Sequence, residues 1–342
     1  MQANDDPSSS TGEPMIRLRG VGKTYADGTV AVQDLDLDVP RGSLVCLVGP
    51  SGCGKSTTLK MVNRLIEPTR GTIEMDGRDI THVDPVELRR HIGYVIQQVG
   101  LFPHQTIRTN VATVPSLLGW ERSRSRERAE ELMDLVGLDP ADYADRYPHQ
   151  LSGGQRQRVG VARALAADPP VLLMDEPFGA VDPVTRGRLQ EEFLRLQRDL
   201  HKTVLLVTHD IDEAVRMGDR VAVFATGGRL AQYDVPAQVL GRPADDFVAE
   251  FVGSSRGLRR LSVTPISTED LEPVPGEPPS QSVPVTASLE EALAAMMRHD
   301  DASVSVTDGD RTVGVLTPNG VHAALRRSVA QAPSADPADA AI

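Results

Sequence analysis

A glycine-rich segment at residues 49–56 has the residue types that hold a chain of phosphates. It reads Gly-Pro-Ser-Gly-Cys-Gly-Lys-Ser and fits the pattern G-x-x-x-x-G-K-[S/T]. In this pattern backbone N–H groups wrap the phosphates, Lys55 reaches the β- and γ-phosphates, and the Ser56 hydroxyl binds Mg²⁺. An apolar run at 44–48 precedes the segment and a helical stretch at 56–65 follows it, so the phosphates would lie at a helix N-terminus. The predicted ATP-binding residues are Gly49, Pro50, Ser51, Gly52, Cys53, Gly54, Lys55, Ser56 and Thr57.

A second apolar run, at 171–174, ends in two acids, Asp175 and Glu176. A strand here would place Asp175 in the coordination shell of Mg²⁺. It would leave Glu176 facing the γ-phosphate, where its carboxylate can polarise a water molecule. Strands that end in acidic residues at the edge of a sheet are also common, so a purely structural role is the alternative, and this pair alone favours the metal site only moderately.

The pentapeptide Leu-Ser-Gly-Gly-Gln at 151–155 predicts a second anion site. Ser152 is a typical helix N-cap, and Gly153 and Gly154 allow close approach of the backbone to a ligand. This second site has no lysine. Two phosphate sites in one chain, one of them without a lysine, indicate that ATP is sandwiched between two subunits.

With these motifs, residues 16–253 resemble the ATP-binding subunit of ABC transporters. The resemblance implies an α/β fold: a P-loop ABC-type ATPase domain with an antiparallel β subdomain and a helical subdomain. It implies ATP and Mg²⁺ as cofactors and a homodimer or paired ATPase subunit. The other implied partners are transmembrane permease subunits at the cytoplasmic face of the membrane and, indirectly, an extracytoplasmic solute-binding protein.

The resemblance also assigns roles to single residues. Tyr25 resembles the aromatic residue that stacks on adenine, although a packed strand residue is an equal alternative. Gln97 resembles the loop glutamine that touches Mg²⁺ and senses the permease, with Gln98 as a competitor for that role. Asp182 resembles the interfacial aspartate, and His209 the switch histidine at the γ-phosphate.

Together the motifs and the resemblance give three groups of site residues. The predicted catalytic residues are Glu176, His209 and Gln97. The predicted metal ligands are Ser56, Asp175 and Gln97. The residues predicted to contact ATP across a dimer are Ser152, Gly153, Gly154, Gln155 and Asp182.

Three shorter segments, at 92–104, 145–154 and 166–170, look like the ATPases of osmoprotectant importers, which take up glycine betaine, carnitine, choline or proline. The double glutamine and the Gly-Leu-Phe-Pro-His sequence that follows are the strongest pointers. One alternative is an importer of another small solute, such as a polar amino acid. The other is an ABC ATPase outside transport, but those carry a second ATPase half or a long coiled-coil insertion, and this sequence has neither.

The elements that must position these motifs follow from the hydrophobic pattern. Residues 30–39 alternate apolar and acidic side chains, which predicts a half-buried antiparallel strand. The runs at 44–48, 171–174 and 204–207 are apolar throughout, which predicts central strands of a parallel sheet. Apolar residues at helical spacing predict an amphipathic helix over 185–200. The result is a layered α/β domain with a small antiparallel sheet.

Composition narrows the class of protein. The net charge is −12 at pH 7, which argues against a general nucleic-acid binder, because such proteins normally have a basic face. No apolar run approaches the roughly 18 residues that cross a bilayer. Two cysteines, Cys46 and Cys53, provide neither a disulfide framework nor metal-ligand spacing, and a reducing cytoplasm fits.

Composition shifts along the chain predict five segments. They are a disordered leader (1–14), the ABC ATP-binding domain (15–253), a Pro-rich linker (254–281), a single domain similar to a CBS domain (282–328) and a disordered tail (329–342). In the fourth segment, Thr317 occupies the place of a threonine that binds adenosine in CBS domains. Gly320 stands where the ribose-binding aspartate would be, so the segment either modulates without binding nucleotide or has a structural or dimerising role.

Overall fold

The computed structural model describes residues 13–330 except 97–98, 180, 276–278, 300–301 and 310. Most of the predicted leader and tail lies outside the described residues, and so do Gln97 and Gln98. The chain forms two compact units. The first contains the described residues up to Asp210 together with Phe224–Leu230, and the second contains Ile211–Val223 and the described residues from Ala231 onward. Every described residue of the predicted site belongs to the first unit.

A four-stranded antiparallel sheet has the order β2-β1-β4-β5. Its strands are β1 (Ile16–Thr24), β2 (Val30–Val39), β4 (Arg70–Met75) and β5 (Arg78–Asp79). In β2 the apolar residues Leu35, Leu37 and Val39 are buried. Each of them is paired with a residue of β1 across the ladder. The alternating pattern of the sequence is therefore confirmed as one face on the core and one face toward solvent.

A six-stranded sheet has the order β10-β9-β3-β8-β7-β6. β3, β8, β7 and β6 run parallel to one another, and every residue of β3 and β8 is buried, as the continuous apolar runs predict. Ligands of such sheets bind beyond the carboxyl ends of the strands. The strands are β3 (Leu44–Val48), β6 (Ile92–Val95), β7 (Val171–Asp175), β8 (Thr203–Val207), β9 (Arg220–Ala225) and β10 (Arg229–Asp234).

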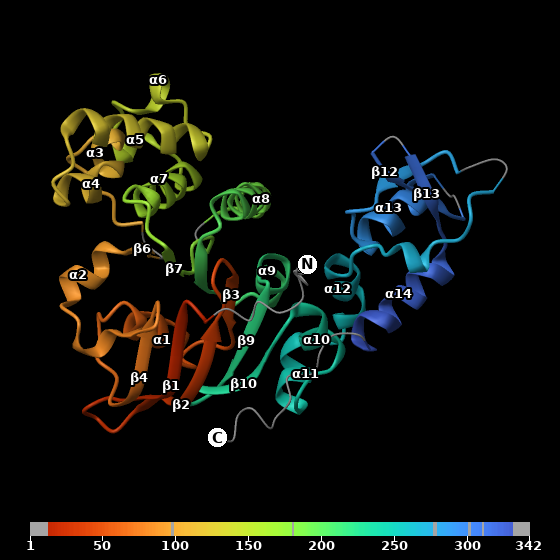
Figure 1. Cartoon of the computed structure of the whole chain (residues 1–342), viewed down its shortest axis with the longest axis horizontal. Helices are drawn as coiled ribbons and strands as arrows, with labels where there is room; N and C mark the ends of the chain where they lie inside the picture. Colours follow the sequence, from red (N-terminus) through yellow and green to blue (C-terminus); the bar gives the residue numbers. More distant parts are fainter. Residues whose placement is uncertain are drawn as a thin grey trace, which may run out of the picture. The chain divides into compact units, whose positions relative to one another are not determined.

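Helices follow or connect these strands in the first unit. Helix α1 (Lys55–Val62) follows β3, and η1 (Ile80–His82) and α2 (Pro85–Arg90) lie between β5 and β6. Helix α8 (Pro183–Leu200) follows β7 and buries the predicted stripe of Leu189, Phe193 and Leu196. The helical subdomain groups α3 to α7, drawn from yellow to yellow-green in Figure 1. Its helices are α3 (Ile107–Val111), α4 (Thr113–Leu117), α5 (Arg122–Leu135), α6 (Pro140–Tyr143), η2 (Pro148–Gln150) and α7 (Gly153–Leu165).

The second unit contains a three-stranded sheet of order β11-β12-β13 with helices beside it. Its core includes Leu289, Met296, Val304, Val306 and Leu316. Strand β11 is parallel to β12, and β13 is antiparallel to β12. The elements are α9 (Ile211–Met217), α10 (Pro236–Gly241), α11 (Asp246–Val252), α12 (Arg256–Val263), η3 (Thr268–Asp270), β11 (Ser282–Pro284), α13 (Leu289–His299), β12 (Val304–Asp308), β13 (Arg311–Leu316) and α14 (Pro318–Ala330).

The segment predicted as a Pro-rich linker carries structure of its own. Helix α12 occupies its first third and ends at Val263, because the residue before Pro265 is driven toward extended backbone. Its Leu261 belongs to the same buried cluster as Leu289 of α13. Arg259 on its other side forms an ion pair with Asp212 of α9. Helix α12 is therefore packed on both sides within the second unit.

Candidate active site

The phosphate-binding loop lies between β3 and α1, where the sequence predicts it. Two of its glycines are required by geometry. At Gly49 a β-carbon would lie 2.3 Å from the carbonyl oxygen of Phe224, and at Gly54 it would lie 2.2 Å from that of Ala31. Gly54 is also the N-cap of α1 and has φ +99°, a conformation that side-chain-bearing residues avoid. These close approaches and the left-handed backbone at Gly54 fix the shape of the loop.

The lysine of this loop is held by the loop itself. The Lys55 side chain is buried, and its Nζ donates to the carbonyl oxygens of Gly49 at 2.7 Å and Pro50 at 3.0 Å. A buried ammonium needs such partners, because an unpaired buried charge is costly. The same donor can turn to phosphate oxygens, which are charged acceptors and bind an ammonium more strongly than carbonyls do.

The two expected metal ligands meet. The Ser56 hydroxyl at the start of α1 donates to Asp175 Oδ1 at the end of β7, at 2.8 Å. Burial raises the pKa of the Asp175 carboxyl, although this hydrogen bond opposes the shift. Burial and the charge of Asp175 together raise the pKa of Tyr94 to about 12. A hydroxyl and a carboxylate are the hard oxygen ligands that Mg²⁺ uses beside substrate phosphates, so these residues fit the ion.

Glu176 and His209 also meet. Glu176 Oε2 lies 3.4 Å from His209 Nδ1, and the Glu176 side chain is the more buried of the two. The backbone of Glu176 has φ +46° and its N–H donates to the carbonyl of Val207 in β8 at 2.9 Å. A left-handed conformation is strained for glutamate, and such strain is found mostly at functional sites. The turn directs this carboxylate away from the path of β7 and toward His209.

The pentapeptide Leu-Ser-Gly-Gly-Gln starts α7. Ser152 is the N-cap, and its Oγ accepts from the N–H of Gln155 at 3.2 Å. Gln155 Oε1 in turn accepts from the N–H of Ser152 at 2.8 Å, which completes a capping box. Ser152 and Gly153 are exposed, so the helix start is open to an incoming anion. Asp182 is exposed as well, and its backbone carbonyl accepts from the N–H of Arg186.

Tyr25 follows the end of β1, and 41% of its surface is exposed. This exposure does not fit the alternative of a packed strand residue. The Nζ of Lys23 lies 5.5 Å from the ring centroid. Such a ring is free to stack on a base, because its face is not covered by the core. Gln97 and Gln98 lie outside the described residues, so the assignment of the loop glutamine stays a prediction.

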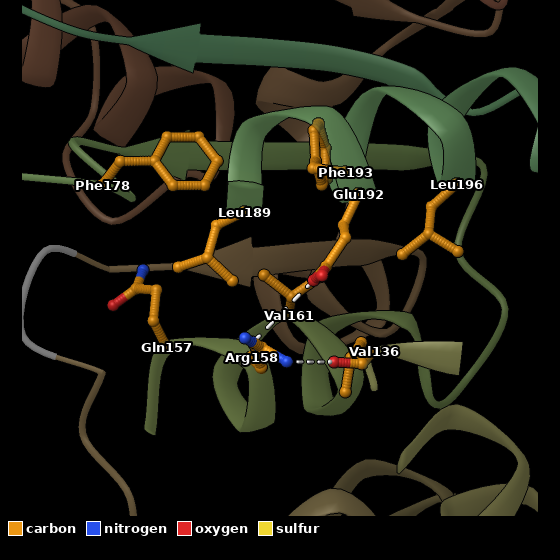
Figure 2. Close-up of a pocket in the computed structure, with 9 residues that line it drawn as sticks. All are labelled: Val136, Gln157, Arg158, Val161, Phe178, Leu189, Glu192, Phe193 and Leu196. Atoms are coloured by element: carbon orange, nitrogen blue, oxygen red, sulfur yellow. Dashed lines mark hydrogen bonds and ion pairs between the residues drawn. The ribbon is translucent and has the colours of Figure 1, made fainter. Parts of the chain in front are cut away.

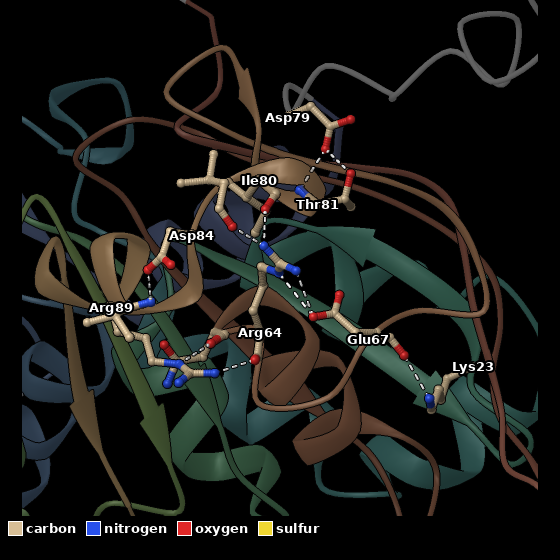
Figure 3. Close-up of polar contacts among 11 residues, drawn as sticks. Lys23, Arg64, Glu67, Asp79, Ile80, Thr81, Asp84 and Arg89 are labelled. Atoms are coloured by element: carbon tan, nitrogen blue, oxygen red, sulfur yellow. Dashed lines mark hydrogen bonds and ion pairs between the residues drawn. The ribbon is translucent and has the colours of Figure 1, made fainter.

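Three arginines that the sequence did not single out bind backbone carbonyls in the first unit. Arg64 donates to the carbonyl of Ile80 and to Glu67, as Figure 3 shows. Arg64 also donates to the carbonyl of Val83, and Arg89 donates to the carbonyl of Asn63 just past α1. These cations lie where the negative end of the α1 dipole favours them. Arg163 of α7 donates to the carbonyls of Val99 and Gly100, just after the predicted loop glutamine.

A small apolar pocket lies between α7 and α8, and Figure 2 shows the side chains that line it. Leu189, Phe193 and Leu196 of α8 form one wall. Arg158 of α7 spans its edge, with Nε 3.8 Å from a Glu192 carboxylate oxygen. None of the predicted site residues lines this pocket. It therefore marks a packing seam between two helices and not the nucleotide site.

Within the described part of the chain, no three His, Cys, Asp or Glu side chains gather as a metal site would need. A magnesium ion held by Ser56 and Asp175 would take its remaining ligands from the nucleotide and water, which is the usual arrangement for this ion. None of the helices in the described ranges combines the length and the apolar character required to cross a bilayer.

Known proteins resemble the chain over most of its length. The family model for ABC transporters matches residues 32–179. The choline transport ATP-binding protein OpuBA of Bacillus subtilis is 50% identical over 301 residues, which cover 87% of this chain and 77% of that protein. The glycine betaine/carnitine/choline transport ATP-binding protein OpuCA of the same organism is 52% identical over 82% of this chain and 71% of its own length. The osmoprotectant import ATP-binding protein OsmV of Salmonella typhimurium is 50% identical over 86% of this chain and 77% of its own length.

Solved structures give the same result for the fold. An ATP-binding cassette solved as a dimer in a post-hydrolysis state with ADP and phosphate aligns with a TM-score of 0.58 at 35% identity. The alignment covers 65% of this chain and 99% of that one. A subunit of a Clostridium perfringens ABC transporter complex aligns with a TM-score of 0.63 at 27% identity, over 68% of this chain and 93% of its own.

Proposed function

The chain belongs to the ABC transporter family of ATP-hydrolysing subunits, and we propose that it powers an importer of osmoprotectants such as glycine betaine, carnitine, choline or proline. The observation that carries the substrate class is the agreement among relatives. Three of them, each about half identical to this chain and matched over more than 70% of their own length, are named for choline, carnitine, glycine betaine or osmoprotectant transport.

The nucleotide is proposed to bind between two subunits. The loop 49–57 and Lys55 would hold its phosphates, and Tyr25 would stack on its base. Ser152, Gly153, Gly154, Gln155 and Asp182 of a second copy or a paired ATPase subunit would close the site from the other side. A bound Mg²⁺, held by Ser56, Asp175 and the loop glutamine Gln97, would neutralise charge on the phosphates.

Hydrolysis is proposed to depend on the pair Glu176 and His209. Glu176 follows Asp175 at the carboxyl end of β7, and a carboxylate at this position can accept a proton from an attacking water. His209, 3.4 Å from that carboxylate, holds it in place and can reach the γ-phosphate from its exposed position. The donors of the loop are preorganised, so they need not rearrange when charge develops in the transition state.

The subunit is proposed to act at the cytoplasmic face of the membrane, docked on separate transmembrane permease subunits. Closing of the ATPase pair on ATP would drive the permease, and hydrolysis would reopen it. A solute-binding protein outside the cytoplasm would deliver the solute without touching this chain. Nucleic acid is not a proposed partner, because the net charge is −12.

The domain at 282–328 is proposed to modulate transport without binding adenosine nucleotides. A β-carbon at Gly320 would lie 2.6 Å from the backbone oxygen of Asp270, so no side chain fits where a ribose-binding carboxylate would stand. The Thr317 hydroxyl donates to Glu272 at 2.9 Å and accepts from the N–H of Gly320. The groups expected to meet a nucleoside are therefore already paired.

The substrate class is tested by uptake in cells that lack the gene for this chain. We expect uptake of labelled glycine betaine, choline, carnitine or proline to fall and to return with the wild-type gene but not with a Glu176→Gln variant. Unlabelled osmoprotectants should compete with the label. Unchanged uptake of all four solutes, together with loss of uptake of a polar amino acid, would contradict the proposed substrate.

A further inference from the structure

The start of α7 is tied to a residue that no motif includes, Tyr143 at the end of α6. Both the oxygen and the nitrogen of the Gln155 side-chain amide form hydrogen bonds. Its Oε1 accepts from the N–H of Ser152 at 2.8 Å, and its Nε2 donates to the hydroxyl oxygen of Tyr143 at 3.1 Å. The capping box at the helix start therefore has a third member, contributed by a different helix.

These bonds fix the direction of the Gln155 amide. The N–H of Ser152 can only donate, so the amide oxygen must face it and the NH₂ group must point away. The Tyr143 hydroxyl provides an acceptor at the position where that NH₂ group points. A glutamine side chain has three rotatable bonds, and the loss of either partner would release it to sample other rotamers.

Tyr143 is itself held firmly. The guanidinium of Arg146 lies 4.5 Å from the Tyr143 ring centroid and donates to the carbonyl of Asp142 at 2.7 Å. The carbonyls of Ala144 and Arg146 accept from the first N–H groups of α3, at 3.0 and 2.8 Å. The hydroxyl of Tyr143 is therefore presented from a braced turn, which makes it a fixed reference point for Gln155.

The orientation of the Gln155 side chain affects Ser152. Its Oγ accepts from the N–H of Gln155 at 3.2 Å, so its hydroxyl hydrogen remains available to donate outward. We propose that Tyr143 is a positioning residue: it orients the Gln155 side chain, which fixes the Ser152 backbone N–H, and the Ser152 hydroxyl is thereby placed to donate to the γ-phosphate of ATP bound by the opposite subunit. This inference rests on the proposed function, in which Ser152 faces the nucleotide of a second copy.

The test removes one oxygen atom. Tyr143→Phe keeps the ring and its contact with Arg146 but deletes the acceptor of the Gln155 amide. Loss of one neutral hydrogen bond corresponds to a change of about 2–10-fold. We expect the KM for Mg²⁺-ATP of the full chain to rise by that factor with kcat nearly unchanged, because the bond supports ground-state and transition-state binding alike. Tyr147→Phe, four residues along the same segment and exposed, is the matched control and should keep the wild-type KM.

A double-mutant cycle separates positioning from a general structural effect. If Tyr143 acts through Gln155, Tyr143→Phe should change KM in the wild-type background but not in a Gln155→Ala background. A wild-type KM for Tyr143→Phe, or an equal effect in both backgrounds, would overturn the inference. Gly154→Asp should abolish turnover whatever Tyr143 does. If Gly154→Asp keeps full activity, the proposed function itself fails, so the two failures can be told apart.

Discussion

Two regions of the molecule carry residues of types that bind phosphates or nucleosides: the nucleotide-binding region of the first unit and the C-terminal domain of the second. The two regions differ in how these residues are surrounded. In the first, Ser56 and Asp175 come from separate elements and meet at 2.8 Å, and the neighbouring Lys55 ammonium is held by backbone carbonyls of the loop. In the second, Thr317 is satisfied by Glu272, and the backbone at Asp270 fills the space beside Gly320.

The difference shows what makes a site. A single matching residue such as Thr317 forms a site only where further binding groups gather beside it and the neighbouring backbone leaves room. Arg327 pairs with the buried carboxylate of Asp270, which holds the turn η3 against α14. Breaking such a buried pair is strongly unfavourable, so the pair helps to keep the backbone of Asp270 in place beside Gly320. The first unit instead gathers an ammonium, a hydroxyl and a carboxylate at the end of the phosphate-binding loop.

The largest effect is expected at the catalytic carboxylate. Glu176→Gln should lower kcat by at least about 10²-fold, because the amide cannot accept the proton of the attacking water. ATP binding should survive, since Glu176 holds neither phosphate nor metal in the proposed site. Steady-state ATPase assays and size-exclusion chromatography with Mg²⁺-ATP would measure the two effects, and we expect an ATP-bound dimer to accumulate. Glu127→Gln, on the exposed face of α5, is a matched control.

Near-normal turnover in Glu176→Gln would show that another group orients the water. A protein that stays monomeric with Mg²⁺-ATP would contradict the trapping of a closed pair. Either result would remove the feature that most separates the first unit from the C-terminal domain.

A smaller effect, on stability, is expected in the C-terminal domain. Gly320→Asp restores the carboxylate that the resemblance to a CBS domain would require, but its β-carbon would meet the carbonyl of Asp270. We expect a loss of about 1–3 kcal/mol of unfolding free energy from overpacking and no gain of nucleotide affinity. Denaturant unfolding and calorimetric titration of the full chain with AMP, in a Lys55→Ala background to silence the ATP site, would measure both.

Gly257→Asp is the control for this substitution, because a β-carbon there meets nothing within 4 Å. It should change stability much less than Gly320→Asp does. Micromolar binding of AMP to the Gly320→Asp variant would mean that the domain has an adenosine site after all. The contrast between the two regions would then rest on one missing carboxylate and not on packing.

The elements that position the active site could be predicted because their signals are local. The apolar runs of β3, β7 and β8 and the stripe of α8 follow from periodicity alone. The phosphate-binding loop follows from its pattern between a strand and a helix. The near contact of Glu176 with His209 needs the sheet order as well, because these residues follow neighbouring strands that are distant in sequence.

Other features carried no local signal. Arg64, Arg89 and Arg163 bind backbone carbonyls, and a carbonyl partner is the same in every residue, so no side-chain pattern reveals it. The prediction of a linker at 254–281 was based on its prolines. It did not anticipate α12, whose stability depends on Leu261 packing into a core that is built mostly from later residues. Both the carbonyl contacts of the arginines and the formation of α12 depend on tertiary structure.

The central claim is that each ATP site is shared between two copies of the chain, and complementation tests it most directly. Lys55→Ala removes the ammonium of the loop, and Gly154→Asp places a carboxylate at the start of α7, where it would repel the γ-phosphate. Each variant alone should be inactive. ATPase activity of the two purified variants, measured alone and after mixing over a range of protein concentrations, should reappear only in the mixture, because a mixed pair contains one intact site. Full specific activity of the wild-type chain as a monomer at high dilution, or full activity of either variant alone, would contradict a shared site.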